Sequence, residues 1–422
     1  MTRPIQVLSV VLLLSILACS QFSKLPFGKP EEITAGTQSP AELTPGVSTT
    51  ESAQGTLQGN QSGVKIVYIA TNSNRNLAID TQGNTYEWGT YTVGPANSPC
   101  KGGDACKLSP SRVPGFSGAV AISPGFDHNL ALKGDGTVWA WGQNETYQLG
   151  QGTLDTEYHT IPIQVPGLTD VTAISAGANF SLALKKDGTV WAWGINSAGQ
   201  LGDGKDSYTP DYGLREESPF QVVNLGDVIA IDSGTAHAIA LRKDGTVWTW
   251  GFNQFGELGL GSADTVQHPI PAQVPGLADV VAIGAGFENN LVKKKDGTVW
   301  AWGGNYGAQL GTGTMDQEPH ASPIQIAAFA NAVMLDSSSM QIMALLPDGT
   351  VWTLGVMENG IQALSPAPVP GLTGMVAISA GEDHAMALSQ DGSLWAWGKN
   401  TVGQLGDGTM NSQGQPIQAI FP

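Results

Sequence analysis

The chain has 422 residues, with 36 acidic and 19 basic side chains and a formal net charge of −17. That balance opposes non-specific binding to nucleic acid, which needs a basic footprint, so we expect no nucleic-acid partner. The 55 glycines and 25 prolines, with little helical periodicity, favour short strands and tight turns over a helical fold.

The N-terminus predicts export. Arg3 precedes an apolar run from Ile5 to Ala18, which is typical of a secretory signal and short for a membrane-spanning helix. The run ends in Ala18-Cys19, which resembles the cleavage box of bacterial lipoproteins and implies cleavage before Cys19 and acylation of that residue. The alternative is an ordinary signal peptide with an incidental cysteine. We expect an exported protein in the cell envelope that contacts a bacterial membrane only through this lipid anchor.

Three regions follow from composition. Residues 1–18 are the predicted lipoprotein signal peptide. Residues 19–62 are small, polar or proline-rich without hydrophobic periodicity, so they cannot bury enough apolar area to offset their ordering entropy. We expect this stretch to be a disordered tether that begins at the lipidated cysteine. Residues 63–422 remain for the folded part.

A short phrase recurs seven times in this folded part and contains every tryptophan of the chain. Its clearest copies read Asp-Gly-Thr-Val-Trp-Ala-Trp-Gly. The phrase closes on glycines about fifty residues apart, which indicates a repeat architecture. These closing glycines are Gly89, Gly142, Gly194, Gly251, Gly303, Gly355 and Gly398.

The third repeat shows how one unit is built. Four of its segments have the composition of strands: 171–175, 180–184, 189–193 and 220–223. Asp187-Gly188, between the second and third segments, suits the positive φ angles of a tight hairpin. Each repeat is therefore predicted to be a four-stranded antiparallel sheet.

The third segment is apolar on both faces. Val190 and Ala192 point to one side, whereas Trp191 and Trp193 point to the other. A sheet with one solvated face would alternate apolar and polar residues instead. Small sheets buried on both faces pack around an axis, so we expect an all-β, seven-bladed β-propeller of four-stranded antiparallel blades, with both tryptophans filling the gap between blades. Ring closure requires the last segment, 416–420, to lie near the first, 64–68.

Three elements of the repeat together resemble the regulator of chromosome condensation repeat family. They are a Gly-x-x-His element, the tryptophan phrase, and Asn-x-x-Gly-Gln-Leu-Gly. The matching stretches include Gly125 to His128, Gly234 to His237, Gly381 to His384, Asn196 to Gly202 and Asn400 to Gly406. The resemblance implies a seven-bladed propeller. It says little about function, because function lies in loops that differ between members of a fold.

The chain departs from the family pattern in places. The first repeat has Tyr86 for the first tryptophan, and the sixth has Leu354 for the second. The family's founder is a nucleotide-exchange factor for a nuclear GTPase, an activity not expected of an exported chain. Exported bacterial members of the family look like binding proteins.

The cysteines and polar motifs offer little chemistry. Cys100 and Cys106 are expected to form a disulfide in an exported protein, because no further ligands accompany them to hold a metal. No phosphate-binding loop, nucleophile elbow or zinc motif occurs, so we expect no cofactor and no metal. Two carboxylate pairs could serve a carbohydrate-active enzyme: Glu216-Glu217 and Glu382-Asp383. On so acidic a chain such pairs more often form a solvated face, and we expect no enzyme.

The loops after the tryptophan strands are the better site. Tyr147, Phe255 and Tyr306 occupy corresponding loops of three blades and should emerge on one rim. The loop at 205–217 adds further interface-type residues: Tyr208, Tyr212 and Arg215. We predict that this rim binds an unknown macromolecular partner, most simply a protein. The competing functions are a carbohydrate-active enzyme and a structural part of envelope assembly.

Overall fold

The computed structural model describes residues 63–90, 106–205, 215–357 and 361–422. Leu57–Pro422 form one compact unit, and the other unit, Met1–Thr56, lies outside the described residues. The signal peptide, Cys19 and the tether therefore remain predictions. In the described part of the chain, no helix has the length and apolar character needed to cross a membrane.

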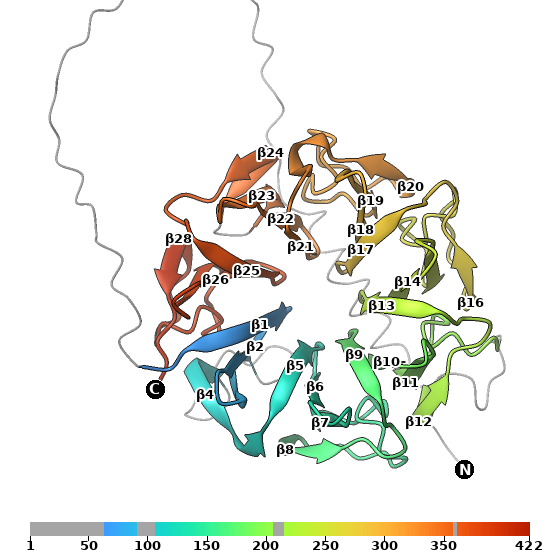
Figure 1. Ribbon diagram of the computed structural model, residues 1–422, viewed down its shortest axis with the longest axis horizontal. Helices are drawn as coiled ribbons and strands as arrows, with labels where there is room; N and C mark the ends of the chain where they lie inside the picture. Colours follow the sequence, from blue (N-terminus) through green and yellow to red (C-terminus); the bar gives the residue numbers. More distant parts are fainter. Residues whose placement is uncertain (1–62, 91–105, 206–214, 358–360) are drawn as a thin grey trace, which may run out of the picture. The chain divides into compact units, whose positions relative to one another are not determined.

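The folded unit is a seven-bladed β-propeller (Figure 1), which confirms the predicted fold. Each blade is a four-stranded antiparallel sheet whose strands follow one another in sequence, from the innermost to the outermost. Apart from these strands, the described residues contain a single-turn 3-10 helix, Ala327–Phe329.

The strands occupy equivalent places in the seven blades. The innermost strands are β1 (Ile66–Asn72), β5 (Ala119–Pro124), β9 (Val171–Ala176), β13 (Val228–Ser233), β17 (Val280–Ala285), β21 (Met334–Ser337) and β25 (Met375–Ala380). The second strands are β2 (Arg75–Asp80), β6 (His128–Lys133), β10 (Phe180–Lys185), β14 (His237–Arg242), β18 (Asn289–Lys294), β22 (Gln341–Leu345) and β26 (His384–Ser389). The third strands are β3 (Asn84–Thr90), β7 (Val138–Gly142), β11 (Val190–Ile195), β15 (Val247–Gly251), β19 (Val299–Gly303), β23 (Val351–Val356) and β27 (Leu394–Gly398). The outermost strands are β4 (Cys106–Ser117), β8 (His159–Gln164), β12 (Arg215–Gln221), β16 (His268–Gln273), β20 (His320–Gln325), β24 (Gln362–Pro368) and β28 (Gln413–Gln418).

The outermost strand of the third blade differs from its prediction. It begins at Arg215 and ends at Gln221, earlier than the expected 220–223. Ile195 pairs with Arg215 across the ladder, so the third strand holds its neighbour further back than the local apolar pattern indicated. Arg215 is thus a strand residue and not a loop residue.

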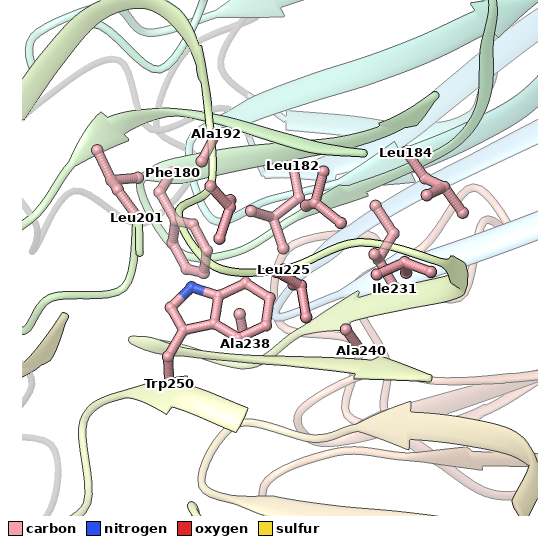
Figure 2. Close-up of a cluster of buried hydrophobic side chains, with 13 residues drawn as sticks. Phe180, Leu182, Leu184, Ala192, Leu201, Leu225, Ile231, Ala238, Ala240 and Trp250 are labelled. Carbon is pink, nitrogen blue, oxygen red and sulfur yellow. The ribbon is translucent and has the colours of Figure 1, made fainter. Parts of the chain in front are cut away.

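Apolar seams join neighbouring blades, and a tryptophan is buried in each of them except the one that contains Leu354. In Figure 2 the Trp250 indole projects toward Phe180 and Leu201 of the preceding blade. Val190 and Ala192 line the same seam. The small apolar face of one blade therefore receives the large aromatic face of the next.

The two tryptophans of a blade differ in burial, which corrects part of the sequence interpretation. Trp193 has no exposed surface and lies wholly in the seam. Trp191 only partly reaches it and is half-buried. Its Nε1–H donates to Thr189 Oγ1 at 3.2 Å, and Lys185 Nζ lies 5.3 Å from a ring centroid. The first tryptophan therefore packs against the edge of the seam near the hairpin turn and fills the gap only in part.

The ring closes without strand exchange. β28 pairs with β27, and β1 pairs with β2, so the first and last strands belong to different sheets. The two blades meet through side-chain packing and a few backbone hydrogen bonds, such as the one from Gly408 N–H to Leu108 O at 3.0 Å. Phe421 packs edge-on against Tyr86 and Trp88 at centroid distances of 5.4 and 6.0 Å. The expected nearness of the two chain ends is thus achieved by packing and not by a shared sheet.

Hydrogen bonds also link the innermost strands around the axis. Ala176 N–H donates to Ser123 Oγ at 2.9 Å, and Ala285 N–H donates to Asp232 Oδ2 at 2.9 Å. In both bonds the donor belongs to the blade that follows the acceptor's blade in sequence. Between the first two blades the corresponding residues are Ala70 and Pro124. Neither can take part, since alanine has no side-chain acceptor and proline has no N–H.

Candidate partner-binding rim

One end of the propeller carries two kinds of connection. The turn from the first to the second strand lies beside the loop that follows the third strand, because the second and third strands are antiparallel. In the second blade His128 pairs with Gly142, and Gln143 N–H donates to Asp127 O at 2.8 Å. The hairpins between second and third strands lie at the opposite end.

The loop after the third strand is held by its own asparagine. In the fourth blade Asn253 Oδ1 accepts from Leu258 N–H at 3.2 Å, while Asn253 Nδ2 donates to Ser262 O at 2.9 Å. Phe255 N–H donates to Glu257 Oε2 at 2.8 Å. The Asn-x-x-Gly-Gln-Leu-Gly pattern therefore fixes the direction in which the residue at its third position emerges.

The same loop of the fourth blade is hydrogen-bonded to the fifth blade. Trp302 Nε1–H of the fifth blade donates to Glu257 O at 2.8 Å. Asn290 Nδ2 donates to that same oxygen at 2.7 Å, and Asn290 Oδ1 lies 3.1 Å from His237 Nε2. The carbonyl, the amide and the imidazole together form a relay across the seam.

The relay recurs at two other seams. It runs through His128, Ser181 and Gln148, and through His384, Asn76 and Gln404. Burial lowers the pKa of His128 and His384 to about 3 and that of His237 to about 4, so all three are neutral. These histidines connect neighbouring blades through hydrogen bonds.

The glycine of Gly-x-x-His makes room for the imidazole. A Cβ on Gly234 would lie 2.2 Å from His237 Cε1, so no larger residue fits without moving the ring. The spacing of the motif is therefore a packing requirement of the turn.

Aromatic side chains gather at this end of the molecule in packed groups. Phe255 and Tyr306, from neighbouring blades, lie edge-on with centroids 5.3 Å apart, and Phe252 lies 6.5 Å from Phe255. Tyr147 lies apart from them, and Arg215 Cζ stands 5.3 Å from its ring centroid. The structure thus brings together two of the three predicted aromatics and pairs the third with the predicted arginine.

Sequence reasoning missed a third group. Phe126 and Phe287 come from the turns of the second and fifth blades, which are not neighbours, and their centroids are 5.1 Å apart. They therefore meet across the propeller axis. The available signal was the phenylalanine after the glycine in Gly125-Phe126 and Gly286-Phe287. We call the half-buried set Phe126, Tyr147, Phe252, Phe255, Phe287 and Tyr306 the aromatic rim.

Acidic groups lie among these rings. Burial and the nearby charge of Glu382 raise the pKa of Glu288 to about 7. Glu382 Oε2 accepts from Ser73 Oγ at 3.1 Å, and Asp383 Oδ2 pairs with Lys399 Nζ at 3.0 Å. Carboxyl groups therefore lie beside the aromatic rim, and the charge of Glu288 depends on pH near neutrality.

In each of the two carboxylate pairs, other side chains engage at least one member. Glu216 and Glu217 are successive residues of β12, and Glu216 pairs with Lys205 Nζ at 2.7 Å. Glu382 and Asp383 are engaged as just described. A cavity lined by Arg112 to Ser117 includes neither pair. Within the described ranges, no group of three or more His, Cys, Asp or Glu side chains is placed to hold a metal.

Some predicted residues cannot be placed. Tyr208, Tyr212 and Cys100 lie outside the described residues. Cys106 begins β4, directly after residues 91–105, which lie outside the described part of the chain. The disulfide between Cys100 and Cys106 therefore remains a prediction, as does the contribution of the two tyrosines to the rim.

Comparisons with known proteins agree with the repeat pattern. The family model of the Regulator of chromosome condensation (RCC1) repeat matches more than half of the chain, at residues 135–184, 187–241, 244–291, 296–345 and 391–422. A second model of the same repeat matches residues 119–148, 171–200, 228–257 and 375–404.

Two relatives illustrate how widely the repeat is used. The chain is 28% identical over 363 residues to the Ultraviolet-B receptor UVR8 of Arabidopsis thaliana, covering 82% of this chain and 79% of the receptor. It is 31% identical over 281 residues to the Probable E3 ubiquitin-protein ligase HERC6 of Homo sapiens, covering 64% of this chain. That match spans only 26% of the ligase.

Solved structures share the fold at low identity. Human WBSCR16 matches with a TM-score of 0.69 and 22% identity over 80% of this chain and 94% of its own. Prp20p from Saccharomyces cerevisiae, described with binding properties to Gsp1p and histones, matches with a TM-score of 0.66 and 20% identity over 84% and 87%. Family models, relatives and fold agree, and the chain belongs to the family of regulator of chromosome condensation (RCC1) repeat proteins.

Proposed function

We propose that this protein is a non-catalytic binding protein of the cell envelope, whose aromatic rim docks a macromolecular partner, most simply another protein. The proposal rests on one observation: half-buried aromatic side chains gather in packed groups at a single end of the propeller. Rigid aromatic rings supply a large contact area at low entropic cost, which makes them effective interface anchors.

Charge indicates the kind of partner. Glu288, Glu382 and Asp383 lie on this end, and the whole chain carries a formal net charge of −17. An acidic surround steers a basic protein toward the rim and makes its association slower at high salt. A nucleic-acid partner is disfavoured for the same reason. Prp20p, which shares the fold, is described as binding Gsp1p and histones, both proteins.

Loss of the rim aromatics should abolish partner binding. We would replace Tyr147, Phe255 and Tyr306 together by alanine in the full chain and compare cross-linked partners from native membranes. The matched control replaces Val120, Ile229 and Val281 by serine; these are 53 to 55% exposed and lie in the first half of innermost strands, toward the opposite end. The control should keep its partners. A folded rim variant that keeps every partner would refute this placement, and glycan turnover abolished by Glu382→Gln would favour the carbohydrate-active alternative.

The envelope location is a separate part of the proposal. It is supported by the apolar run ending in Ala18-Cys19. Cys19→Ala should release the protein from membranes or leave it unprocessed, because the acylated residue would be lost. Fractionation and intact mass measure both effects. If membrane association and mass are unchanged, the chain has no such anchor.

A further inference from the structure

Six β-branched apolar side chains are exposed at equivalent places, where the innermost strands begin. Their exposed fractions lie between 50 and 59%. They are Val67, Val120, Ile229, Val281, Val333 and Val376. The third blade has Thr172 at this place, and its hydroxyl donates to Leu184 O at 3.2 Å. A single exposed valine needs no explanation, whereas six such side chains around one axis form an apolar surface.

β-Bulges turn these side chains out of the sheets. In the first blade Ile66 pairs with Asp80 and Tyr68 pairs with Ile79, so the register of the ladder shifts at Val67. A bulged residue leaves the regular alternation of its strand, and its side chain is aimed elsewhere. The register shifts at the same place in four other blades, at Val120, Ile229, Val281 and Val376.

The six side chains surround one mouth of the propeller axis. The innermost strands form a circle around the axis (Figure 1), and their first residues lie at the end where hairpins join the second and third strands. Ala119, next to Val120, pairs with Lys133, the last residue of β6. Val333 N–H donates to the oxygen of Leu345, the last residue of β22, at 2.8 Å. We call the six side chains the aliphatic ring; it lies at the end opposite to the aromatic rim.

Half-buried tryptophans and basic side chains lie at this same end. In the second to fifth blades a Lys or Arg stands over the first tryptophan of the phrase, 4.2 to 5.9 Å from a ring centroid. These pairs are Lys133 with Trp139, Lys185 with Trp191, Arg242 with Trp248, and Lys294 with Trp300. Tryptophan and long basic side chains are the residues that occupy the boundary between hydrocarbon and water in membranes.

Charges of both signs are mixed at this end. Arg242 Nη2 lies 3.4 Å from Asp227 Oδ2, and its Nη1 lies 3.9 Å from Asp244 Oδ2. Lys186 directly precedes Asp187 in the third blade. These basic hairpins therefore contain their own counter-charge, although the whole chain carries a formal net charge of −17. Such a surface is compatible with a layer that itself carries both signs of charge, as zwitterionic phospholipid headgroups do.

The chain also enters the propeller here. Ile66 N–H, at the start of β1, donates to Gly392 O in the hairpin of the seventh blade at 3.4 Å. Lys65 O accepts from Thr81 N–H in the hairpin of the first blade at 3.0 Å. The segment that begins at the predicted lipid anchor, Cys19, is therefore joined to the propeller beside the aliphatic ring. A linker raises the effective concentration of the surface to which it is joined, so a weak contact suffices.

We propose that the hairpin end is a membrane-contact surface, whose aliphatic ring inserts at the boundary between phospholipid headgroups and acyl chains. The tryptophans and basic side chains of the hairpins then lie among the headgroups. The inference rests on the envelope location given under the proposed function, and it adds a protein contact to the lipid anchor that the sequence analysis expected to be the sole membrane contact. It also points the aromatic rim away from the membrane, toward a partner. A second copy of the chain is a poorer occupant, because two molecules of net charge −17 repel each other.

The test uses protein purified from membranes with its anchor and reconstituted into phosphatidylcholine vesicles, with or without bromine on the acyl chains. Bromine quenches indole fluorescence on contact, so the parent should be quenched by the brominated vesicles. The ring variant Val120→Ser, Ile229→Ser and Val281→Ser should lose more than about half of that quenching, because half of the aliphatic ring is gone. The matched control replaces Ile161, Val266 and Ile270 by serine and should be quenched like the parent; these residues are 49 to 61% exposed and lie in or just before outermost strands.

Three results would overturn the inference. One is an acylated parent that is not quenched, and another is equal quenching of the parent and the folded ring variant. The third is a dimer, seen by sedimentation, that the ring variant loses, since a second copy would then cover the aliphatic ring.

Failure of this inference and failure of the proposed function are distinguishable. The variant at Tyr147, Phe255 and Tyr306 contains no residue of the aliphatic ring and should keep the quenching. The ring variant should keep its protein partners, because its anchor and its aromatic rim are unchanged. Intact mass shows separately whether Cys19 is acylated, and a chain without the anchor would refute the envelope location together with the inference that rests on it.

Discussion

At the scale of single residues, the seams show how one hydrogen bond is conserved when its surroundings change. The first repeat has no Gln-Leu-Gly sequence, and Trp141 Nε1–H is accepted by Glu87 Oε2 at 3.0 Å instead of by a backbone carbonyl. Glu87 is buried, and its other oxygen pairs with Lys107 Nζ at 2.7 Å. A carboxylate in the strand thus replaces an oxygen from the loop, with a lysine to balance its charge.

Trp193→Ala should cost about 3–5 kcal/mol of unfolding free energy, as truncation of a fully buried aromatic does. Trp191→Ala should cost less than half as much, because that ring is half-buried. Urea unfolding of the two variants measures both values. Equal losses would mean that the two indoles contribute alike to the seam, as the sequence interpretation assumed.

Glu257→Gln should stabilise the protein at alkaline pH. Burial raises the pKa of Glu257 to about 8, and its Oε1 has no hydrogen-bond partner among the described residues. A carboxyl group whose pKa is raised on folding contributes stability at low pH that is lost as pH rises toward and through about 8. The uncharged amide escapes this loss.

Unfolding at pH 5 and pH 9 provides the measurement for this variant. The difference from the parent should be near zero at pH 5 and about 1–3 kcal/mol in favour of the variant at pH 9. Gln309, at the equivalent position, donates its amide to Ser339 O at 2.7 Å, which shows that glutamine fits. A difference that does not change with pH would mean that Glu257 is not a buried acid.

At the scale of elements, hydrogen bonds join innermost strands of neighbouring blades, and between the first two blades the donor and the acceptor are both missing. Ser379 Oγ accepts from Thr71 N–H of the next blade at 3.0 Å, and Asp336 Oδ2 accepts from Ala380 N–H at 2.9 Å. The pair Ala70 and Pro124 lacks both the acceptor and the donor. At the contact between β1 and β5, neither of these two positions therefore leaves a polar group unpaired.

This complementarity predicts a coupled pair of mutations. Pro124→Ala should introduce a buried N–H without an acceptor and destabilise the protein by about 1–3 kcal/mol. Adding Ala70→Ser should supply the acceptor and recover most of that loss. A double-mutant cycle in urea measures the coupling, and strictly additive effects would exclude the predicted hydrogen bond.

The elements also show how far sequence patterns reach. Strand-like composition predicted the four strands of a blade, and apolar residues on both faces of 189–193 predicted its two buried faces, because both signals depend on neighbours in sequence. The depth of burial of each tryptophan could not be predicted in this way, because Trp191 and Trp193 share a face and only contacts with the preceding blade distinguish them. The meeting of Phe126 and Phe287 was equally out of reach, since it depends on where two distant turns lie around the axis. The pairing of Tyr147 with Arg215 required the early start of β12.

At the scale of the whole molecule, the ring is held shut by the packing of its last residues. Phe421 is 8% exposed and lies in a cluster with Ile66, Tyr86, Trp88 and Leu405. Because no strand is exchanged between the terminal blades, this cluster carries much of the closure.

Phe421→Ala should therefore lower the unfolding free energy by about 3–5 kcal/mol although it is the penultimate residue. Ile420→Ala is the matched control, because Ile420 is 58% exposed and should cost no more than about 0.5 kcal/mol. Thermal or urea unfolding distinguishes the two. Similar small losses would show that closure depends on other contacts.

Each blade is formed by one continuous stretch of the sequence, and this bears on how the number of blades can change in evolution. Every sheet is completed within its own repeat, so a blade begins and ends where the repeat does. Duplicating or deleting one repeat in the gene would add or remove a whole blade without splitting any sheet. In propellers that close by strand exchange, the same event must preserve a blade assembled from both ends of the chain. Changes in blade number should thus be more accessible to evolution in this architecture, with the terminal aromatic cluster as the contact that has to adapt.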